Sequence, residues 1–262
     1  MNFEPYLFET LSPEIFGPKH LIGSLFVTLL ISLILISTLM IVKNKNHSRV
    51  LKITALFILT LELTKYLYTI ITLGSLPLHY IPMQLCSFSL YLMPITAFSK
   101  GKVAEFFRPT TFAIGLMAGL VVLLYPATVL GGDYNWLPLS DNVIQIISFL
   151  YHGTMVFFAL YLVLSKTYVP KFKDYPRAYA SLLVFAMMAA LTNAFFGTDM
   201  MVLNTANGSP FQFVLLEYGR LNYMLVMLFL AMVILILPFA PSAIRSIRFT
   251  GQTKKSQVTS KN

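Results

Sequence analysis

Residues 21–42 read LIGSLFVTLLISLILISTLMIV and contain no charged side chain. An α-helix rises about 1.5 Å per residue, so a run of this length crosses the roughly 30 Å hydrocarbon core of a bilayer. Glutamates precede the run where a signal peptide would have a basic region, and Lys43 and Lys45 follow it without a cleavage pattern of small residues. We therefore expect this segment to remain as a transmembrane helix.

Composition extends this expectation to the whole chain. Of 262 residues, 57% are hydrophobic and 11% are charged, whereas soluble domains have about 25% charged residues. The sequence predicts an all-α, polytopic membrane protein with a single domain (residues 1–248) and a disordered, basic cytoplasmic tail (residues 249–262). The seven predicted transmembrane helices are approximately 21–42, 50–73, 81–98, 109–129, 142–165, 179–197 and 218–239.

The distribution of cations predicts the orientation. Sixteen of the 19 Lys and Arg residues lie in the first, third and fifth connectors and in the tail, on one side of the expected membrane. The positive-inside rule then places the N-terminus outside and the C-terminus in the cytoplasm. Membrane topology accounts for the net charge of +9, and no nucleic-acid partner is predicted.

Ionisable groups inside the apolar runs require an explanation, because each costs about 2.5–3.5 kcal/mol at the bilayer centre. By helical rise, Glu62, Lys65 and His152 lie near mid-bilayer, and Cys86 lies about 8 Å shallower than His152. Further polar side chains are expected in the outer half of the membrane, at Gln84, Gln145, Asn193 and Arg220. Together these residues predict a polar cavity that opens on the outer face.

Several interpretations of these residues stay open. Glu62 and Lys65 either neutralise each other, since they lie three residues apart on one helix, or leave Lys65 to bind substrate. Cys86 is either a small packing residue or a reactive thiol. The single cysteine and the spacing of the four histidines do not fit a metal site, and no glycine-rich cofactor motif occurs, so no metal and no cofactor are predicted.

Four segments carry a family resemblance: LPLH at 76–79, PMQLCS at 82–87, SFLYHG at 148–153 and GRLNY at 219–223. In this order they resemble the YwaF-like family of seven-helix integral membrane proteins, which includes the animal transmembrane-protein-164 acyltransferases. The resemblance implies a cysteine nucleophile at Cys86 and a histidine partner at His152. It also implies membrane lipids as partners and, for this chain, a multi-pass location in a bacterial cell membrane.

Two functions remain. The first is a membrane-embedded lipid acyltransferase or lipase, in which Cys86 and His152 are catalytic. Its expected substrate-binding residues are Gln84, Gln145, Lys65, Asn193 and Arg220. The second is a transporter or small-anion-binding component that uses Glu62, Lys65, His152 and Arg220. Polar groups confined to the outer half favour the enzyme and favour a membrane lipid over a cytosolic thioester as acyl donor.

Overall fold

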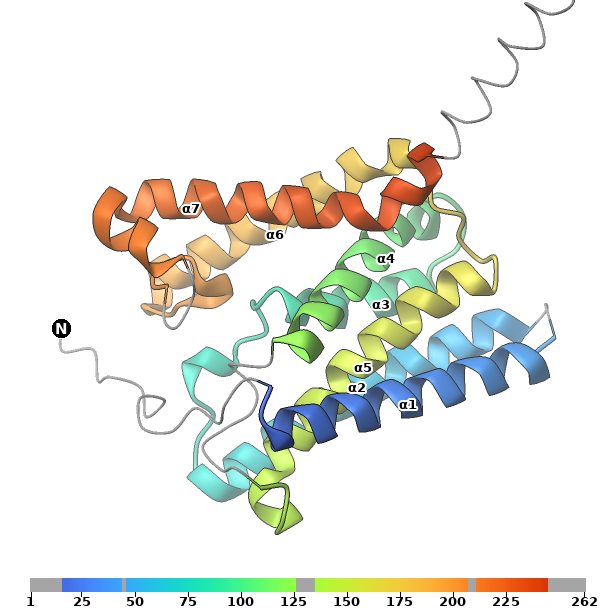
Figure 1. Cartoon of the computed structure of the whole chain (residues 1–262), viewed down its shortest axis with the longest axis horizontal. Coiled ribbons are helices and arrows are strands. Elements are labelled where there is room, and N and C mark those ends of the chain that lie inside the picture. Colours follow the sequence, from blue (N-terminus) through green and yellow to red (C-terminus); the bar gives the residue numbers. More distant parts are fainter. Residues whose placement is uncertain (1–15, 44–45, 126–134, 207–210, 245–262) are drawn as a thin grey trace, which may run out of the picture.

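The computed structural model describes residues 16–43, 46–125, 135–206 and 211–244, and across these ranges the chain forms helices and no strand (Figure 1). The α-helices are α1 (Pro18–Ile41), α2 (His47–Leu73), α3 (Ser89–Phe98), α4 (Gly101–Leu124), α5 (Val143–Leu164), α6 (Tyr175–Phe196) and α7 (Gln212–Ile236). Short 3-10 helices lie at Leu78–Tyr80, Cys86–Phe88, Leu139–Asn142, Phe172–Asp174, Met200–Val202 and Leu237–Phe239. The predicted tail, residues 249–262, lies outside the described ranges.

Six of the helical segments in this part of the chain are long and apolar enough to cross a membrane. Three of them, α4, α6 and α7, begin four or more residues earlier than predicted. The proposed start at Pro109 is wrong because this proline lies inside α4, which begins at Gly101. Helix α6 begins at Tyr175 instead of residue 179. Helix α7 begins at Gln212, and its predicted start at residue 218 lies beside a kink at Gly219, where φ is 80° and ψ is 171°.

The third predicted span differs most. Residues 81–85 are not helical, and the apolar helix that follows, Cys86–Phe98, is shorter than the other six. Pro82 lacks a backbone N–H, and the residue before a proline is disfavoured in the α-helical conformation. A helix of this length rises about 20 Å, less than the roughly 30 Å hydrocarbon core. The described chain therefore has six membrane-length helices and one short helix, in place of the seven predicted.

Helix α5 lies at the centre of the bundle and packs against α1, α2 and α4, as Figure 1 shows. Of its most apolar stretch, 72% is buried within the protein, against 11% for α1. Helix α4 approaches α5 closely because Gly115 and Gly119, four residues apart, face its backbone. The site described below is built around this central helix.

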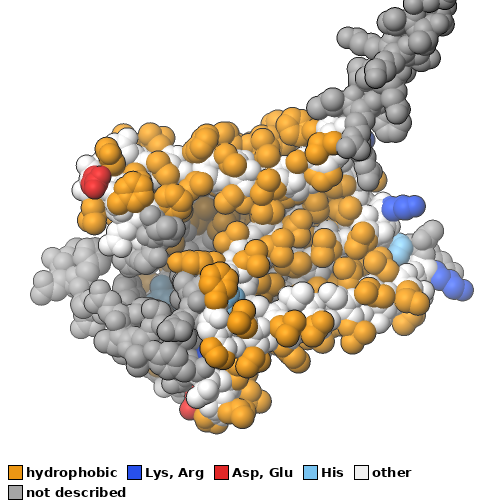
Figure 2. Space-filling model, viewed as in Figure 1, with side chains coloured by type: hydrophobic (Ala, Val, Ile, Leu, Met, Phe, Trp, Pro, Cys, Tyr) orange, Lys and Arg blue, Asp and Glu red, His pale blue; other side chains and the backbone are white. Residues whose placement is uncertain are grey.

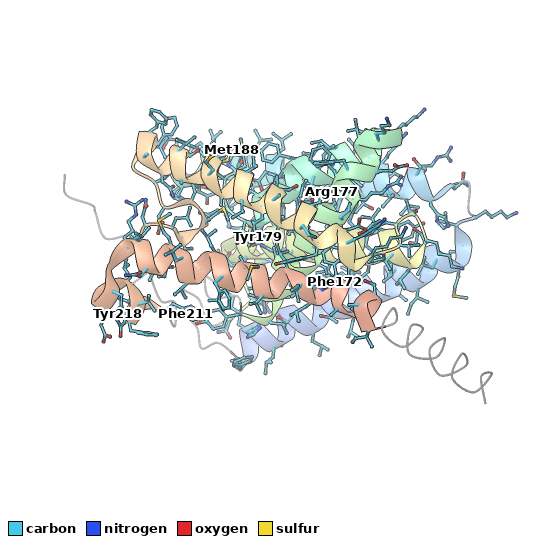
Figure 3. The ribbon with its side chains drawn as sticks, turned by 90° about the horizontal axis from the view of Figure 1, so that it is seen from above. Phe172, Arg177, Tyr179, Met188, Phe211 and Tyr218 are labelled. Atoms are coloured by element: carbon cyan, nitrogen blue, oxygen red, sulfur yellow. The ribbon has the colours of Figure 1, made fainter. Side chains whose placement is uncertain are left out.

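Helices α6 and α7 form a pair along one side of the bundle (Figures 1 and 3). The hydroxyl of Tyr179 on α6 is directed toward α7 and donates to the carbonyl of Leu228 at 3.4 Å. Tyr175 donates in the same way to the carbonyl of Met232 at 3.2 Å. Side-chain hydrogen bonds to backbone carbonyls thus join two helices that are otherwise apolar.

The surface matches a membrane environment. Figure 2 shows apolar side chains along the whole length of the helices, with Lys and Arg side chains visible mainly at the end of the molecule where α1 terminates. Large apolar side chains such as Leu33, Ile71 and Phe229 are exposed. The protein is therefore an integral, multi-pass membrane protein in contact with lipid. Its orientation stays a prediction.

Candidate functional site

Cys86 stands at the start of the short third helix, and α5 fixes its backbone. The hydroxyl of Tyr151 on α5 donates to the carbonyl of Cys86 at 3.3 Å. Tyr151 directly precedes His152, so this hydrogen bond joins the chain at Cys86 to the turn of α5 that carries His152. The depth difference of about 8 Å was worked out for a straight helix, and the non-helical residues 81–85 depart from that assumption.

The non-helical segment before Cys86 is held by side chains from its neighbours. Tyr66 donates to the carbonyl of Tyr80 at 3.0 Å, and Tyr91 donates to the carbonyl of Pro82 at 3.3 Å. The side-chain oxygen of Gln84 accepts the backbone N–H of Met201 at 2.7 Å. Irregular backbone at membrane depth requires such partners, because hydrocarbon supplies none.

His152 is 4% exposed, and one of its two ring nitrogens forms a hydrogen bond within the protein. Its Nδ1 lies 2.7 Å from the carbonyl oxygen of Ser148, and since a carbonyl only accepts, Nδ1 carries the proton. The other nitrogen, Nε2, is buried and has no hydrogen-bond partner. Among the described residues no hydrogen bond joins it to the Cys86 thiol. A buried lone pair without a partner is uncommon and calls for an explanation.

Glu62 and Lys65 form an ion pair on α2. The Lys65 ammonium lies 2.7 Å from each carboxylate oxygen of Glu62, so the two residues do neutralise each other. The ammonium also lies 5.2 Å from the centre of the Tyr66 ring, within cation–π distance. It lies 5.4 Å from the centre of the Tyr80 ring as well, in the segment that leads to Cys86. The ion pair therefore lies beside the segment that carries the thiol.

A groove of about 290 Å³ runs beside this cluster, between α2 and residues 81–98, which are called the third segment below. Its walls are mainly apolar, with two phenol rings and one carboxylate. The lining residues are Leu59, Glu62, Leu63, Tyr66, Pro82, Leu90 and Tyr91. Because several of these side chains are exposed on the outer face of the bundle, the groove opens sideways toward lipid.

The structure places the other predicted binding residues differently. Asn193 accepts the backbone N–H of Met200 at 2.6 Å and donates to its carbonyl at 3.0 Å, and Gln84 binds the same turn through Met201. Gln145 is partly exposed on α5, and Arg220 is exposed just after the kink in α7. None of the four forms a hydrogen bond to Cys86, His152 or the ion pair within the described chain. Their binding roles stay predictions.

Comparison with protein-family models matches residues 15–239 to the TMEM164 family. The chain belongs to the TMEM164 family. Comparisons with curated proteins and with solved structures give no match. The family match supports the transmembrane-protein-164 part of the resemblance and does not extend to the YwaF-like name.

Sequence reasoning missed the tyrosines that build this TMEM164-family site. Tyr66, Tyr80, Tyr91 and Tyr151 each contact a carbonyl, an ammonium or one another around Cys86. Two of these tyrosines could have been found from the sequence, because Tyr66 directly follows Lys65 and Tyr151 directly precedes His152. A phenol beside an ionisable residue in an apolar run is a polar group that needs a partner.

Proposed function

We propose that this TMEM164-family protein is a membrane-embedded lipid acyltransferase or lipase in which Cys86 is the nucleophile and His152 the base. The observation that supports it most is the buried Nε2 of His152, which has no partner while Nδ1 is occupied by Ser148. The neighbouring Tyr151 donates a hydrogen bond to the carbonyl of Cys86, which supports a position of Cys86 close to this part of α5. A cysteine and a neutral imidazole with a free lone pair are the groups that acyl transfer requires.

The reaction follows from these two groups. Nε2 of His152 takes the proton of the Cys86 thiol, and the sulfur attacks the carbonyl carbon of a lipid ester. The carbon–oxygen bond breaks, and the imidazolium returns the proton to the leaving alcohol oxygen. An acceptor alcohol, or water in the lipase reaction, then gives its proton to Nε2 and attacks the thioester carbonyl. The carbon–sulfur bond breaks, and the imidazolium returns the proton to the sulfur, which restores the thiol.

Lys65 supplies the positive charge in this proposal. Cations stabilise thiolates and the negative oxygen of a tetrahedral intermediate. Two of the three ammonium hydrogens face the oxygens of Glu62, and the third remains for a carbonyl oxygen of the substrate. Glu62 thereby orients the ammonium while keeping the pair neutral in hydrocarbon.

Anion transport fits the structure less well. Lys65 is already paired with Glu62, and Arg220, exposed on α7, forms no hydrogen bond or ion pair with either residue within the described chain. Arg220 therefore does not join the other residues that this alternative requires. The enzyme is therefore the better-supported function.

Intact-protein mass spectrometry tests the enzyme. Purified protein in nanodiscs of one defined phospholipid should gain the mass of one acyl chain on Cys86. The adduct should be absent in Cys86→Ser and greatly slowed in His152→Asn. His47→Asn, at the opposite end of α2, is the matched histidine control and should acylate normally.

The donor is tested in the same system. Phospholipid alone should suffice, because the groove opens toward lipid. Adduct formation only after acyl-CoA is added would exclude a membrane lipid as donor, and near-normal acyl transfer by Cys86→Ser would exclude the proposed nucleophile.

A further inference from the structure

The groove between α2 and the third segment combines an apolar wall with a charged floor. Leu63, on its wall, is 56% exposed. The Glu62 side chain, on its floor, is 8% exposed and binds Lys65. A carboxylate at the bottom of a lipid-facing groove, even one paired with a neighbouring ammonium, is costly in hydrocarbon. This placement therefore calls for an occupant that is apolar along its length and polar at one point.

The groove is also adjacent to the proposed nucleophile. Leu90 lines it and lies one helical turn after Cys86, so the two residues are neighbours along one side of the short helix. On the other wall, Glu62 binds Lys65, whose ammonium lies 5.4 Å from the centre of the Tyr80 ring in the segment that leads to Cys86. A group bound over the ion pair would therefore lie beside the segment that carries the sulfur.

We propose that this groove binds one acyl chain of a membrane glycerophospholipid, with the ester carbonyl over the Glu62–Lys65 pair. The inference rests on the proposed function, since the bound lipid is the acyl donor. The chain lies against Leu59, Leu63 and Leu90. The ester carbonyl accepts a hydrogen bond from the ammonium of Lys65, and the head group stays outside the groove.

Size and surroundings favour a lipid chain over other occupants. A volume of about 290 Å³ is at the lower end for small-ligand pockets, which suits part of one chain and excludes a complete lipid. A helix from another protein would set apolar side chains against Glu62 and leave the ion pair without a polar partner. Membrane lipids already surround this face and need no recruitment.

Photo-crosslinking tests the site independently of catalysis. The Cys86→Ala variant, which cannot form an acyl-enzyme, is placed in nanodiscs with a phosphatidylcholine that carries a diazirine in its acyl chain. After irradiation, labelled peptides should include residues 59–66 and 82–91. The same experiment in Cys86→Ala/Leu63→Trp, where the indole fills the groove, should lose this labelling.

Leu56→Trp in the same background is the matched control. Leu56 lies two turns away on the same side of α2, is 53% exposed and does not line the groove, so labelling of residues 59–66 and 82–91 should persist. Unfolding temperatures of the two variants are compared in detergent, and Leu63→Ala repeats the test if the tryptophan prevents folding. With the alanine, the chain should shift and change the labelled positions within these peptides.

The outcomes separate this inference from the proposed function. Labelling confined to other helices, or labelling that Leu63→Trp leaves unchanged, overturns the groove even if acyl-Cys86 forms in the wild type. Labelling of the groove without any acyl-Cys86 in the wild type supports lipid binding there and refutes the enzyme. A crosslink to a second protein chain in place of lipid assigns the groove to a helix partner and also overturns the proposal.

Discussion

Replacing Gly119 by alanine should disturb the site without touching a proposed catalytic group. A Cβ at this position would lie 2.9 Å from the carbonyl oxygen of His152 and 2.8 Å from a methyl of Val156. Ordinary contacts begin at 3.4 Å, so α4 and α5 must separate by about half an ångström in a tightly packed interior. The backbone that must move belongs to His152 itself.

The expected magnitude follows from two opposing contributions. Overpacking of this kind typically costs about 1–3 kcal/mol, and alanine regains about 1 kcal/mol over glycine within a helix. The net loss of stability should be about 1 kcal/mol, or about 2–4 °C in the unfolding temperature of a protein of this size. Because a 1 Å misplacement of reacting groups costs about 100-fold in rate, half that displacement should slow acylation about tenfold.

Gly115→Ala provides the comparison. Its Cβ would lie 3.3 Å from the carbonyl oxygen of Met155 and 3.5 Å from Ala159, so α5 barely has to move. This variant should unfold at or slightly above the wild-type temperature and acylate normally. Unfolding followed in detergent and the rate of adduct formation measure both effects. Equal losses in the two variants, or a wild-type rate in Gly119→Ala, would refute the reasoning.

Three further predictions concern contacts around the site. Tyr151→Phe removes the donor to the carbonyl of Cys86, which should lower stability by about 1–3 kcal/mol and slow adduct formation; an unchanged rate would show that α5 does not position Cys86. Asn193→Ala, which leaves buried backbone groups unpaired, should lower stability by at least as much, as measured by thermal unfolding, while a variant that still folds keeps a reactive Cys86. Burial, and secondarily Lys65, lower the pKa of His79 from its usual 6.5, so the unfolded chain binds the proton more readily and stability should fall as the pH drops below about 6.5; His79→Gln should flatten that part of the unfolding profile, and an unchanged slope would contradict this assignment.

Much of the fold follows from the sequence because membrane spans are local features. The unbroken run of residues 21–42 lies almost entirely within α1, and the ion pair that the spacing of Glu62 and Lys65 allows is present on α2. Hydropathy gives no comparable signal for the third segment. Residues 81–98 are apolar throughout, so average hydropathy does not distinguish the coil at 81–85 from the helix that follows.

The site was predictable in part for a related reason. His152 is the only histidine well inside an apolar run, and its polarity alone marks it as a residue that needs a partner. The partner of Gln84 could not be read from the sequence, because Met201 lies 117 positions further along the chain and contributes a backbone N–H. Backbone groups are common to all residues, so no side-chain pattern predicts which of them will meet an amide.

The short third helix also has a consequence for biosynthesis. Residues 78–86 are made early, yet the hydroxyl that binds the Cys86 carbonyl belongs to Tyr151, and the N–H that binds the Gln84 side chain belongs to Met201. Until the ribosome has delivered α5 and the turn after α6, the Cys86 carbonyl and the Gln84 side chain lack these partners in hydrocarbon. The segment that carries the cysteine therefore gains all of these contacts only once about three quarters of the chain has been translated, and a nascent or truncated protein inserted in the membrane lacks the assembled site that the proposed reaction needs.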